Sequence, residues 1–497
     1  MTATRNTVTL DETERSSQMT QVEVLLGLAN EVEFFTADDD TAYADVRVKG
    51  HRETYPIASQ SFSDWLVRRY YEETDRTPSA AALVSATGLL QARARFDGAK
   101  RSVFIRVGEC DGKLYLDLAN DKWEVVEIDS DGWRVTVDPP VRFRRSRGML
   151  SLPTPTKGGD INILKQLLNI TSDTNFILAV SWLLAAMRPT GPYPILIVTG
   201  EQGSAKSTFT ALLRRILDPN CAPTRALPRD ERDFFIAANN SHILAFDNVS
   251  RLPPLLSDTM CRLATGGSFS TRQLHTDREE ILIHAARPII CNGIEEFVSR
   301  PDLADRAVSL TLRPVPDEER KLEREIWSEF HAHHPLILGV LLDAAVHGLR
   351  NFANVKLDRF PRMADFVQWV VACEPALWPA GSFLSAYCTN RDEVVEGILD
   401  GDSVAIAVRT LITQRGAWRG TASQLCEALA ELSSGKDKQA NLPTCPRALS
   451  GKLRRLAPSL RKGGIEISFD REGRNRNRMI HIIHVTPGPD AEEPETG

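Results

Sequence analysis

The chain has 497 residues, of which 42% are hydrophobic and 25% charged. This composition supplies ample core material and excludes a fibrous or largely disordered chain, and the length favours roughly two to four domains. The net charge of -6 excludes electrostatic binding of nucleic acid by the molecule as a whole, so a nucleic-acid partner would need a local basic patch.

The cysteines and the N-terminal residues predict the cellular compartment in which the protein works. The eight cysteines are scattered singly without a CxxC pair, which argues against a structural zinc site or a disulfide framework and favours a reducing compartment. The first 18 residues lack the apolar segment of a signal peptide, and no apolar run approaches the roughly 20 residues that span a bilayer. We therefore expect a cytoplasmic protein with no membrane partner.

The first third of the chain predicts a small α+β domain. Residues 1–18 are polar and charged, a composition that cannot fold, and we expect them to be disordered, like the tail 486–497. Within 19–150 the segment "QSFSDWLVRRYYEE" predicts a helix, and short alternating segments such as "KLYLDLA" and "GWRVTV" predict strands separated by Asn-Asp and Asp-Gly turns.

A stretch rich in Pro, Gly and Thr at 148–161 predicts a linker. After it, residues 163–315 alternate helical segments with β-branched runs, which predicts a mostly parallel sheet covered by helices. The apolar stretch "FILAVSWLLAAM" at 176–187 reads as a buried helix. Residues 316–399 have helical apolar spacing, and 400–485 form a final unit.

The run "GEQGSAKST" at 200–208 indicates a phosphate-binding loop, because an apolar strand (195–198) precedes it and a helical segment follows. In such a loop backbone N–H groups face the phosphates, a lysine reaches the terminal phosphates and a hydroxyl binds magnesium. Lys206 and Ser207 fit these last two roles, and the alternative is a chance Gly/Ser loop before a helix. The expected contacts to Mg²⁺-ATP come from Gly200, Gly203, Ser204, Ala205, Lys206, Ser207 and Thr208.

Ala205 stands where the usual pattern has its last glycine. We expect alanine to be tolerated there, on the premise that the chain is already entering a helix, for which alanine has a high propensity.

The next strand, "HILAFDN", ends in Asp247, where a carboxylate would hold the magnesium ion or its waters. Asn248 occupies the position of the usual second acid, so either Asp247 or a distant acid activates the attacking water, or hydrolysis is slow. The alternative role for Asp247 is to cap the turn that follows.

A third strand, "RPIICNG", ends in Asn292, an amide suited to orienting water against a terminal phosphate, although Asn-Gly is also a common turn. Farther along, "RPDLADRAVSLTL" offers Arg300 and Arg306 as arginine fingers that reach a neighbouring subunit's phosphate. Surface salt bridges are the alternative for both.

The C-terminal unit has the outline of a winged helix: three helices, then two strands around a basic turn. Between 444 and 478 there are ten Lys and Arg against three Asp and Glu, so the basic charge is concentrated there. A third helix could enter a DNA groove while wing arginines touch phosphates, with strongly salt-dependent binding; a solvated basic face or a protein-docking wing is the alternative. The candidate DNA contacts are Arg447, Lys452, Arg454, Arg455, Arg471, Arg474, Arg476 and Arg478.

Taken together, "GEQGSAKST", "ILAFDN", "RPIICNG" and "DLADRAVSL" resemble the core of superfamily 3 helicases, in particular the primase-helicase ATPases of phages, poxviruses and mobile elements. The resemblance implies an α/β P-loop AAA+ core at about 195–315, preceded by the α+β domain and followed by a helical lid and the winged-helix-like unit. It also implies a hexameric ring with ATP sites between subunits. The family's DNA-contacting hairpin is similar to the segment containing Arg272, His275 and Arg278.

The leading hypothesis is an ATP-dependent DNA helicase or DNA-remodelling ATPase of replication or mobile-element type, acting on single-stranded or forked DNA. A nucleotide-gated DNA-binding regulator, which switches oligomeric state without sustained unwinding, is the alternative, and Asn248 favours it. A small-molecule phosphotransferase would leave the basic C-terminus unexplained. Primase activity is not predicted, because the acidic run at 38–40 reads as a solvated turn and no metal-binding carboxylate pair is found.

Overall fold

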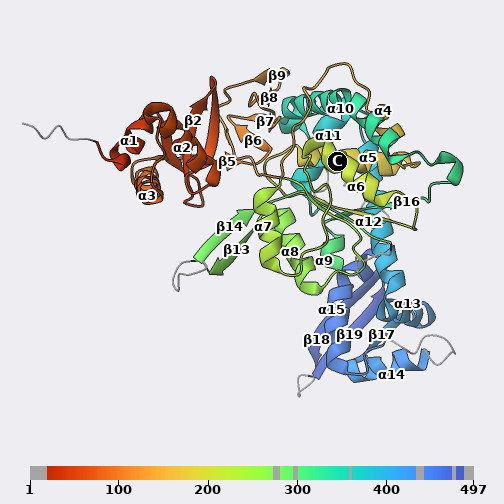
Figure 1. The fold of residues 1–497 in the computed structure, drawn as a ribbon. Helices are drawn as coiled ribbons and strands as arrows, with labels where there is room; N and C mark the ends of the chain where they lie inside the picture. Colours follow the sequence, from red (N-terminus) through yellow and green to blue (C-terminus); the bar gives the residue numbers. More distant parts are fainter. Residues whose placement is uncertain are drawn as a thin grey trace, which may run out of the picture.

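The protein is a mixed α/β molecule whose N-terminal and C-terminal units project from a central unit built on a parallel sheet (Figure 1). The computed structural model describes residues 19–272, 280–294, 300–357, 361–432, 442–472 and 477–485. The predictions of disorder for 1–18 and 486–497 lie outside these residues.

The N-terminal unit packs three helices on a four-stranded sheet of order β3-β2-β1-β4. Helices α2 and α3 begin where they do because Ser59 and Ser79 cap them with their side-chain oxygens. The elements are α1 (Gln21–Leu28), β1 (Glu33–Thr36), β2 (Ala42–Val48), β3 (His51–Pro56), α2 (Gln60–Thr74), α3 (Ala80–Phe96) and β4 (Ala99–Lys100).

An antiparallel meander of order β6-β7-β8-β9 follows, and the short strands β5 and β10 pair beside it. Leu114, Leu116, Val126 and Ile128 of the meander belong to the same buried cluster as the helices of the central unit. The meander is therefore packed as part of the central unit. Its strands are β5 (Val103–Phe104), β6 (Val107–Cys110), β7 (Lys113–Asp117), β8 (Val125–Ile128), β9 (Trp133–Thr136) and β10 (Arg142–Phe143).

The central sheet has the order β12-β15-β11-β16, and its neighbouring strands are all parallel. The prediction of a parallel sheet covered by helices is confirmed, as is the buried helix at 176–187, which is α5. The elements are α4 (Asn162–Leu167), α5 (Asp173–Ala186), β11 (Ile195–Gly200), α6 (Lys206–Leu217), α7 (Glu231–Asn240), β12 (Leu244–Phe246), α8 (Pro254–Thr265), β13 (Gly267–Arg272), β14 (Glu280–Ala285), β15 (Ile289–Asn292), α9 (Pro301–Ala304) and β16 (Ala307–Leu312).

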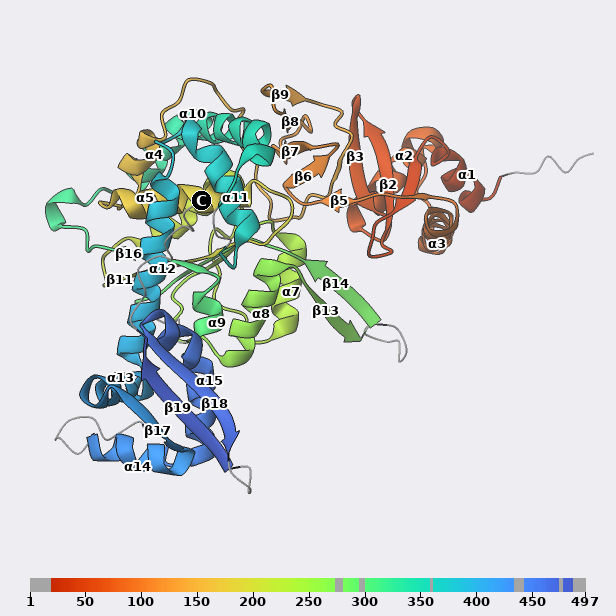
Figure 2. The same cartoon turned by 180° about the vertical axis from the view of Figure 1, so that it is seen from behind.

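Helices α10 (Glu323–Asn351), α11 (Ala364–Cys373) and α12 (Ser382–Gly401) cover the central unit, and the C-terminal unit continues from α12 (Figure 2). Within the described residues α10 is the one helix long and apolar enough to cross a membrane. Half of that apolar window is buried inside the fold, and Ile337, Leu338 and Leu341 are fully buried in the central core. A core helix satisfies the same length and composition test.

The C-terminal unit has its own core and a three-stranded antiparallel sheet of order β17-β19-β18. Strand β17 was missing from the sequence-based outline, which had only the two strands around the basic turn. The elements are α13 (Ser403–Arg415), β17 (Ala417–Thr421), α14 (Ala422–Leu432), α15 (Pro446–Lys462), β18 (Ile465–Glu472) and β19 (Asn477–His484).

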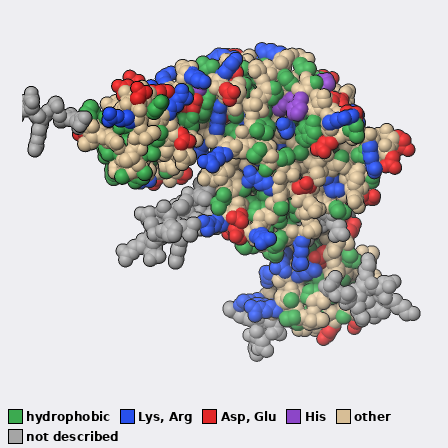
Figure 3. Space-filling view, viewed as in Figure 1, with side chains coloured by type: hydrophobic (Ala, Val, Ile, Leu, Met, Phe, Trp, Pro, Cys, Tyr) green, Lys and Arg blue, Asp and Glu red, His purple; other side chains and the backbone are tan. Residues whose placement is uncertain are grey.

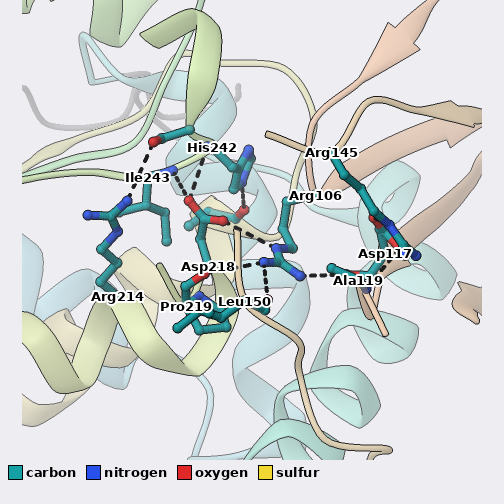
Figure 4. Close-up of polar contacts among 12 residues, drawn as sticks. Arg106, Asp117, Ala119, Arg145, Leu150, Arg214, Asp218, Pro219, His242 and Ile243 are labelled. Carbon is teal, nitrogen blue, oxygen red and sulfur yellow. Dashed lines mark hydrogen bonds and ion pairs between the residues drawn. The ribbon is translucent and has the colours of Figure 1, made fainter. Parts of the chain in front are cut away.

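A buried polar network joins the meander to the central sheet (Figure 4). Arg106, which precedes β6, is fully buried and donates from Nε to Asp218 Oδ1 at 3.2 Å. The other oxygen of Asp218 accepts the backbone N–H groups of His242 and Ile243 at 3.1 and 3.0 Å. Burial alone would raise the pKa of Asp218, but Arg106 and Arg214 outweigh it and hold that pKa below its ordinary value.

We predict that Asp218→Ala strongly destabilises the protein. The substitution leaves the Arg106 charge and two backbone N–H groups buried without their partner, so the free energy of unfolding should fall by about 3–5 kcal/mol. Urea unfolding measures the change. The control is Asp400→Ala, which removes an exposed partner of Arg409 and should cost about 1 kcal/mol at most. Equal effects of the two substitutions would contradict a structural role for the buried pair.

Candidate phosphate-binding site

The loop at 200–208 joins the carboxyl end of the buried strand β11 to the first turn of α6. Two glycines let the backbone turn there. Gly200 has φ +152, and a Cβ on it would lie 2.5 Å from Leu312 O, so a side chain has no room. Gly203 has φ +82, a conformation that favours glycine. The strand, loop and helix predicted from the sequence are therefore present.

Ala205 lies in the left-handed region, with φ 59 and ψ 28, directly before α6. The premise that this residue is already entering the helix is wrong. The left-handed conformation costs an L-amino acid other than glycine about 1–2 kcal/mol, because its Cβ crowds the following carbonyl oxygen. The loop thus keeps the backbone shape that a glycine would favour.

Lys206 is the first residue of α6, and its ammonium group turns back over the loop. Its Nζ donates to the carbonyl oxygens of Gly200 and Glu201, each at 2.7 Å. Partial burial lowers the pKa of Lys206, against the opposing effect of Asp247. A lysine held this way is positioned beside the N–H groups at the start of the helix, where an anion binds favourably.

Ser207 and Asp247, the two residues predicted to bind magnesium, are in contact. Ser207 Oγ donates to Asp247 Oδ1 at 2.9 Å, although the two residues lie 40 positions apart. A hydroxyl and a carboxylate are the hard oxygen ligands that Mg²⁺ accepts while it keeps several waters and phosphate oxygens. Across the described residues no group of three or more His, Cys, Asp or Glu could hold a metal by itself. The pair thus fits a metal that arrives with a phosphate ligand.

Asn292, at the carboxyl end of β15, is buried behind the loop. Its Oδ1 accepts the Asn248 backbone N–H at 3.1 Å, and its Nδ2 donates to Thr210 Oγ1 at 2.9 Å. The side chain therefore ties β15 both to α6 and to the turn after Asp247. Sequence reasoning missed Thr210, since a threonine inside a helix carries no signal of a contact 82 positions away.

Two hollows flank the phosphate-binding loop. One, of about 490 Å³, is lined by the loop together with Asp247, Asn248 and Asn292. The other, of about 700 Å³, shares part of the loop and is lined by apolar residues such as Ile170, Phe209 and Ile326 as well as by charged residues between 313 and 329. The first hollow, called the polar hollow below, has the polar groups that phosphates need, and the apolar residues of the second suit a flat ring. The second hollow is lined by α4, α6, α10 and the segments 168–171 and 313–321, and the sequence motifs did not point to it.

The two candidate arginine fingers lie away from this loop. Arg306 precedes β16, and its carbonyl accepts from Ile195 N, at the amino end of β11. The loop begins at the other end of that strand, roughly 16 Å away at the usual rise of a strand. Arg306 also forms an ion pair with Asp302, and Arg300 one with Asp258 at 2.8 Å. Neither arginine serves the phosphate loop of its own subunit in this arrangement.

The candidate hairpin and wing are formed as pairs of antiparallel strands. Strands β13 and β14 pair from Gly267 to Ala285 and project from α7 and α8 (Figure 1), and Arg272 is the last residue of β13. His275, Arg278, Arg474 and Arg476 lie outside the described residues. Lys and Arg side chains gather on the face of the C-terminal unit over α15 and β18 (Figure 3).

Some of that basic charge is already paired within the chain. Lys452 forms an ion pair with Asp402 at 3.0 Å, and the Arg454 guanidinium stacks on the Phe469 ring at 4.0 Å. Arg461 and Lys462 pair with Glu466 and Asp305. The exposed candidates are Arg447, Arg454, Arg455, Arg471 and Arg478.

We predict that Ala205→Gly raises the free energy of unfolding by up to about 1 kcal/mol. The substitution relieves the left-handed strain, which exceeds the extra freedom that glycine gives the unfolded chain. Ala211→Gly is the control, since Ala211 lies inside α6 with ordinary helical geometry. This substitution should lower the free energy of unfolding by about 1 kcal/mol. If both substitutions lower the unfolding midpoint in urea to the same extent, the strain at Ala205 is disproved.

Comparison with known proteins bears on the central and C-terminal units. A family model described as the actinomycete integrative conjugative element replication protein matches residues 161–396. A second model, the C-terminal domain of the same replication protein, RepA, matches 404–493. No curated protein matches the chain.

Among solved structures, two apo structures of the NrS-1 C-terminal region align with 94% of this chain and with 99% and 98% of their own. Each is 13% identical, with a TM-score of 0.42, a likeness too low to carry an argument about fold or function. The two family models match different segments that together cover about two thirds of the chain. They identify it as a replication protein of a mobile genetic element.

Proposed function

We propose that this replication protein is a Mg²⁺-ATP-dependent DNA motor, a helicase or DNA-remodelling ATPase with a P-loop AAA+ core resembling that of superfamily 3 helicases. The observation that carries the proposal is the contact between Ser207 and Asp247, beside Lys206 and at the carboxyl edge of a parallel sheet. Ligands of open parallel sheets bind at this edge. With Asn292, which lines the same hollow, three sequence motifs that are far apart along the chain supply one site.

The nucleotide is bound in both hollows. Its phosphates lie in the polar hollow, where the N–H groups of the loop and the Lys206 ammonium stabilise their charge. Mg²⁺, held by Ser207 and Asp247, would neutralise charge on the terminal phosphates when bound. The base and sugar extend over Ala205 into the second hollow, of about 700 Å³, where they pack against Phe209 and Ile326.

Arg306 acts on the site of a neighbouring subunit. Its place at the amino end of β16, far from its own phosphate loop, favours a ring in which each site lies between two copies of the chain. Its pairing with Asp302 would be exchanged for the neighbour's phosphate. A hexamer is the ring that the resemblance implies.

DNA is held by the β13–β14 hairpin and by the winged-helix-like C-terminal unit. The order helix, strand, helix, helix, strand, strand from α13 to β19 supports the winged-helix assignment. Arg447 and Arg455 on α15 and Arg471 and Arg478 on the wing are exposed and available for phosphates. The DNA of a mobile genetic element is replicated inside the cell. A motor that acts on this DNA would therefore work in the cytoplasm.

A nucleotide-gated regulator is the second candidate function, and Asn248 is the observation that favours it. Asn248 is exposed, with φ 56, at the position where an acid would activate water. Asp247 is the only carboxylate among the described residues that line the polar hollow. Turnover therefore depends on Asp247 alone or on an acid from another subunit; with neither, ATP would act as a switch.

We predict that Lys206→Ala weakens binding of a fluorescent ATP analogue by roughly 10-fold to 100-fold, the loss expected for a hydrogen bond to a charged group. Fluorescence anisotropy with Mg²⁺ measures the affinity, and a melting curve shows whether the variant is folded. Lys356→Ala, which removes an exposed lysine after η2 (Phe352–Asn354), is the control. Unchanged affinity in a folded Lys206→Ala protein would rule out this nucleotide site.

Shared sites are tested by mixing two inactive variants. Lys206→Ala and Arg306→Ala chains should each lack ATPase activity alone. Mixed in equal amounts, they should recover activity at about a quarter of the interfaces, where an intact Lys206 meets an intact Arg306. If exchange of subunits is shown by labelled chains and activity stays absent, Arg306 does not act between subunits.

A further inference from the structure

A third hollow, with a strongly basic lining, lies between the N-terminal unit and the central unit, away from the phosphate loop. We call it the arginine cleft: a half-open space of about 410 Å³. Four arginines line it, Arg144, Arg145, Arg147 and Arg225, and its described lining residues include no Asp or Glu. The other lining residues are mainly hydroxyl and amide residues, together with Tyr55 and Pro56.

Two of these arginines are fixed in place by contacts within the chain. Arg145 forms a bidentate ion pair with Asp117, at 2.6 and 2.9 Å (Figure 4). It also stacks on the Trp123 ring at 3.7 Å. Arg144 bonds the Asn239 carbonyl and the Asn240 side chain at the end of α7. These neutral amide partners leave the charge of Arg144 uncompensated.

The side chains of Arg147 and Arg225 have no hydrogen-bond or ion-pair partner anywhere in the described part of the chain. Arg225 also lies near the buried Arg214. Burial, together with the charges of Arg225 and Arg106, lowers the pKa of Arg214 to about 10 despite the attraction of Asp218. The cleft is therefore a place of uncompensated positive charge.

The cleft is held in shape by main-chain contacts. At its floor, Cys221 N donates to Gly148 O and Leu150 N to Pro219 O, each at 2.9 Å. A Cβ on Gly148 would lie only 3.0 Å from the Asn220 side chain, which shows how closely the two segments approach. Ser59, Gln60 and Ser61 at the start of α2 also line the cleft, and the first N–H groups of a helix have no intrahelical acceptor.

This chemistry selects an anion. Arginine guanidinium groups bind phosphate through paired N–H donors, and the start of a 15-residue helix adds N–H donors and a favourable dipole. Small-molecule sites are mostly apolar with few polar groups, whereas most residues that line this half-open cleft carry polar or charged side chains. A polar, open, basic surface suits an extended chain of phosphates better than a compact ligand.

We propose that the arginine cleft binds backbone phosphates of a DNA strand where the N-terminal unit meets the central unit. The proposal rests on the DNA-motor function above and adds a contact surface that neither the hairpin nor the wing provides. Helix α7 connects it to the rest of the path, because its end bonds Arg144 and it packs against β13 and β14. A strand that touches the hairpin can continue along α7 into the cleft.

The cleft also has a direct link to the nucleotide site. Arg225 N donates to Ala245 O at 3.0 Å, and Asp247 N donates to Arg225 O at 2.9 Å, so the segment that carries Arg225 is bonded along the edge of β12. A phosphate bound by the Arg225 side chain is therefore coupled, through the Arg225 backbone, to Asp247, the proposed magnesium ligand.

The test uses the full chain and a fluorescein-labelled single-stranded oligonucleotide, with affinity measured by anisotropy at several salt concentrations. Arg147→Ala/Arg225→Ala should bind roughly 10-fold to 100-fold more weakly at low salt, with a salt slope reduced by about 1.4, the value for two lost phosphate contacts. The control, Arg76→Ala/Arg95→Ala, removes two exposed arginines of the N-terminal unit that do not line the cleft, and should leave both quantities unchanged.

A second arm separates DNA from a free nucleotide. A fluorescent ATP analogue is titrated into Lys206→Ala chains with and without the two cleft substitutions. ATP binding that persists in Lys206→Ala and disappears with the cleft substitutions, while DNA binding is unchanged, would show a nucleotide cleft and overturn the proposal. The proposal would also be overturned if the wild-type chain binds DNA and the cleft variant binds it with the same affinity and the same salt slope. Absence of DNA binding by the wild-type chain would instead remove the proposed function and this inference with it.

Discussion

The buried ion pair between Arg106 and Asp218 is the constraint on which the arrangement of the site depends. Helix α6 begins at the phosphate loop and ends at Leu217, directly before Asp218, so the pair fixes the far end of the helix whose first turn would face the phosphates. Through Arg106 the same carboxylate holds the meander, and through His242 and Ile243 it holds the start of β12. A charge pair this deeply buried is stable only while all of its partners stay in place. The meander, the loop helix and the strand that leads to Asp247 therefore form one unit.

The chemistry of the site follows from the parallel sheet. Strands β11, β12 and β15 run in one direction, so their carboxyl ends bring the loop, Asp247 and Asn292 to one edge although they are separated along the chain. The amino end of β16 places Arg306 at the opposite edge. In a ring this polarity would give each subunit one edge that binds nucleotide and one that completes the neighbour's site. Contacts to DNA would then lie outside the sheet, on the hairpin, the wing and the arginine cleft.

Motifs that depend on local sequence were predictable, and features assembled from distant segments were not. The strand, loop and helix around Lys206 and the parallel sheet followed from β-branched runs and glycine spacing. Strand β17 was missed because "AWRGT" lacks regular alternation and gains its place only by pairing with β19. Ala205 was misjudged because propensity describes an average helix position and not a left-handed residue before one. The arginine cleft draws its lining from separate stretches of the chain, and Arg144 to Arg147 directly precede the predicted linker at 148–161 without any motif of their own.

Whether nucleotide turnover is coupled to DNA is the central question about this replication protein. The most direct measurement is steady-state ATP hydrolysis by the full chain with Mg²⁺, with and without single-stranded DNA, at low and moderate salt. A motor in which the proposed DNA contact Arg225 is bonded through its backbone to Asp247 should hydrolyse ATP faster with DNA, and the stimulation should fade as salt rises. Tight ATP binding with negligible turnover, whether or not DNA is present, would contradict the proposal of a motor. It would mean that a site with Asn248 in place of the second acid binds ATP as a switch and does not hydrolyse it.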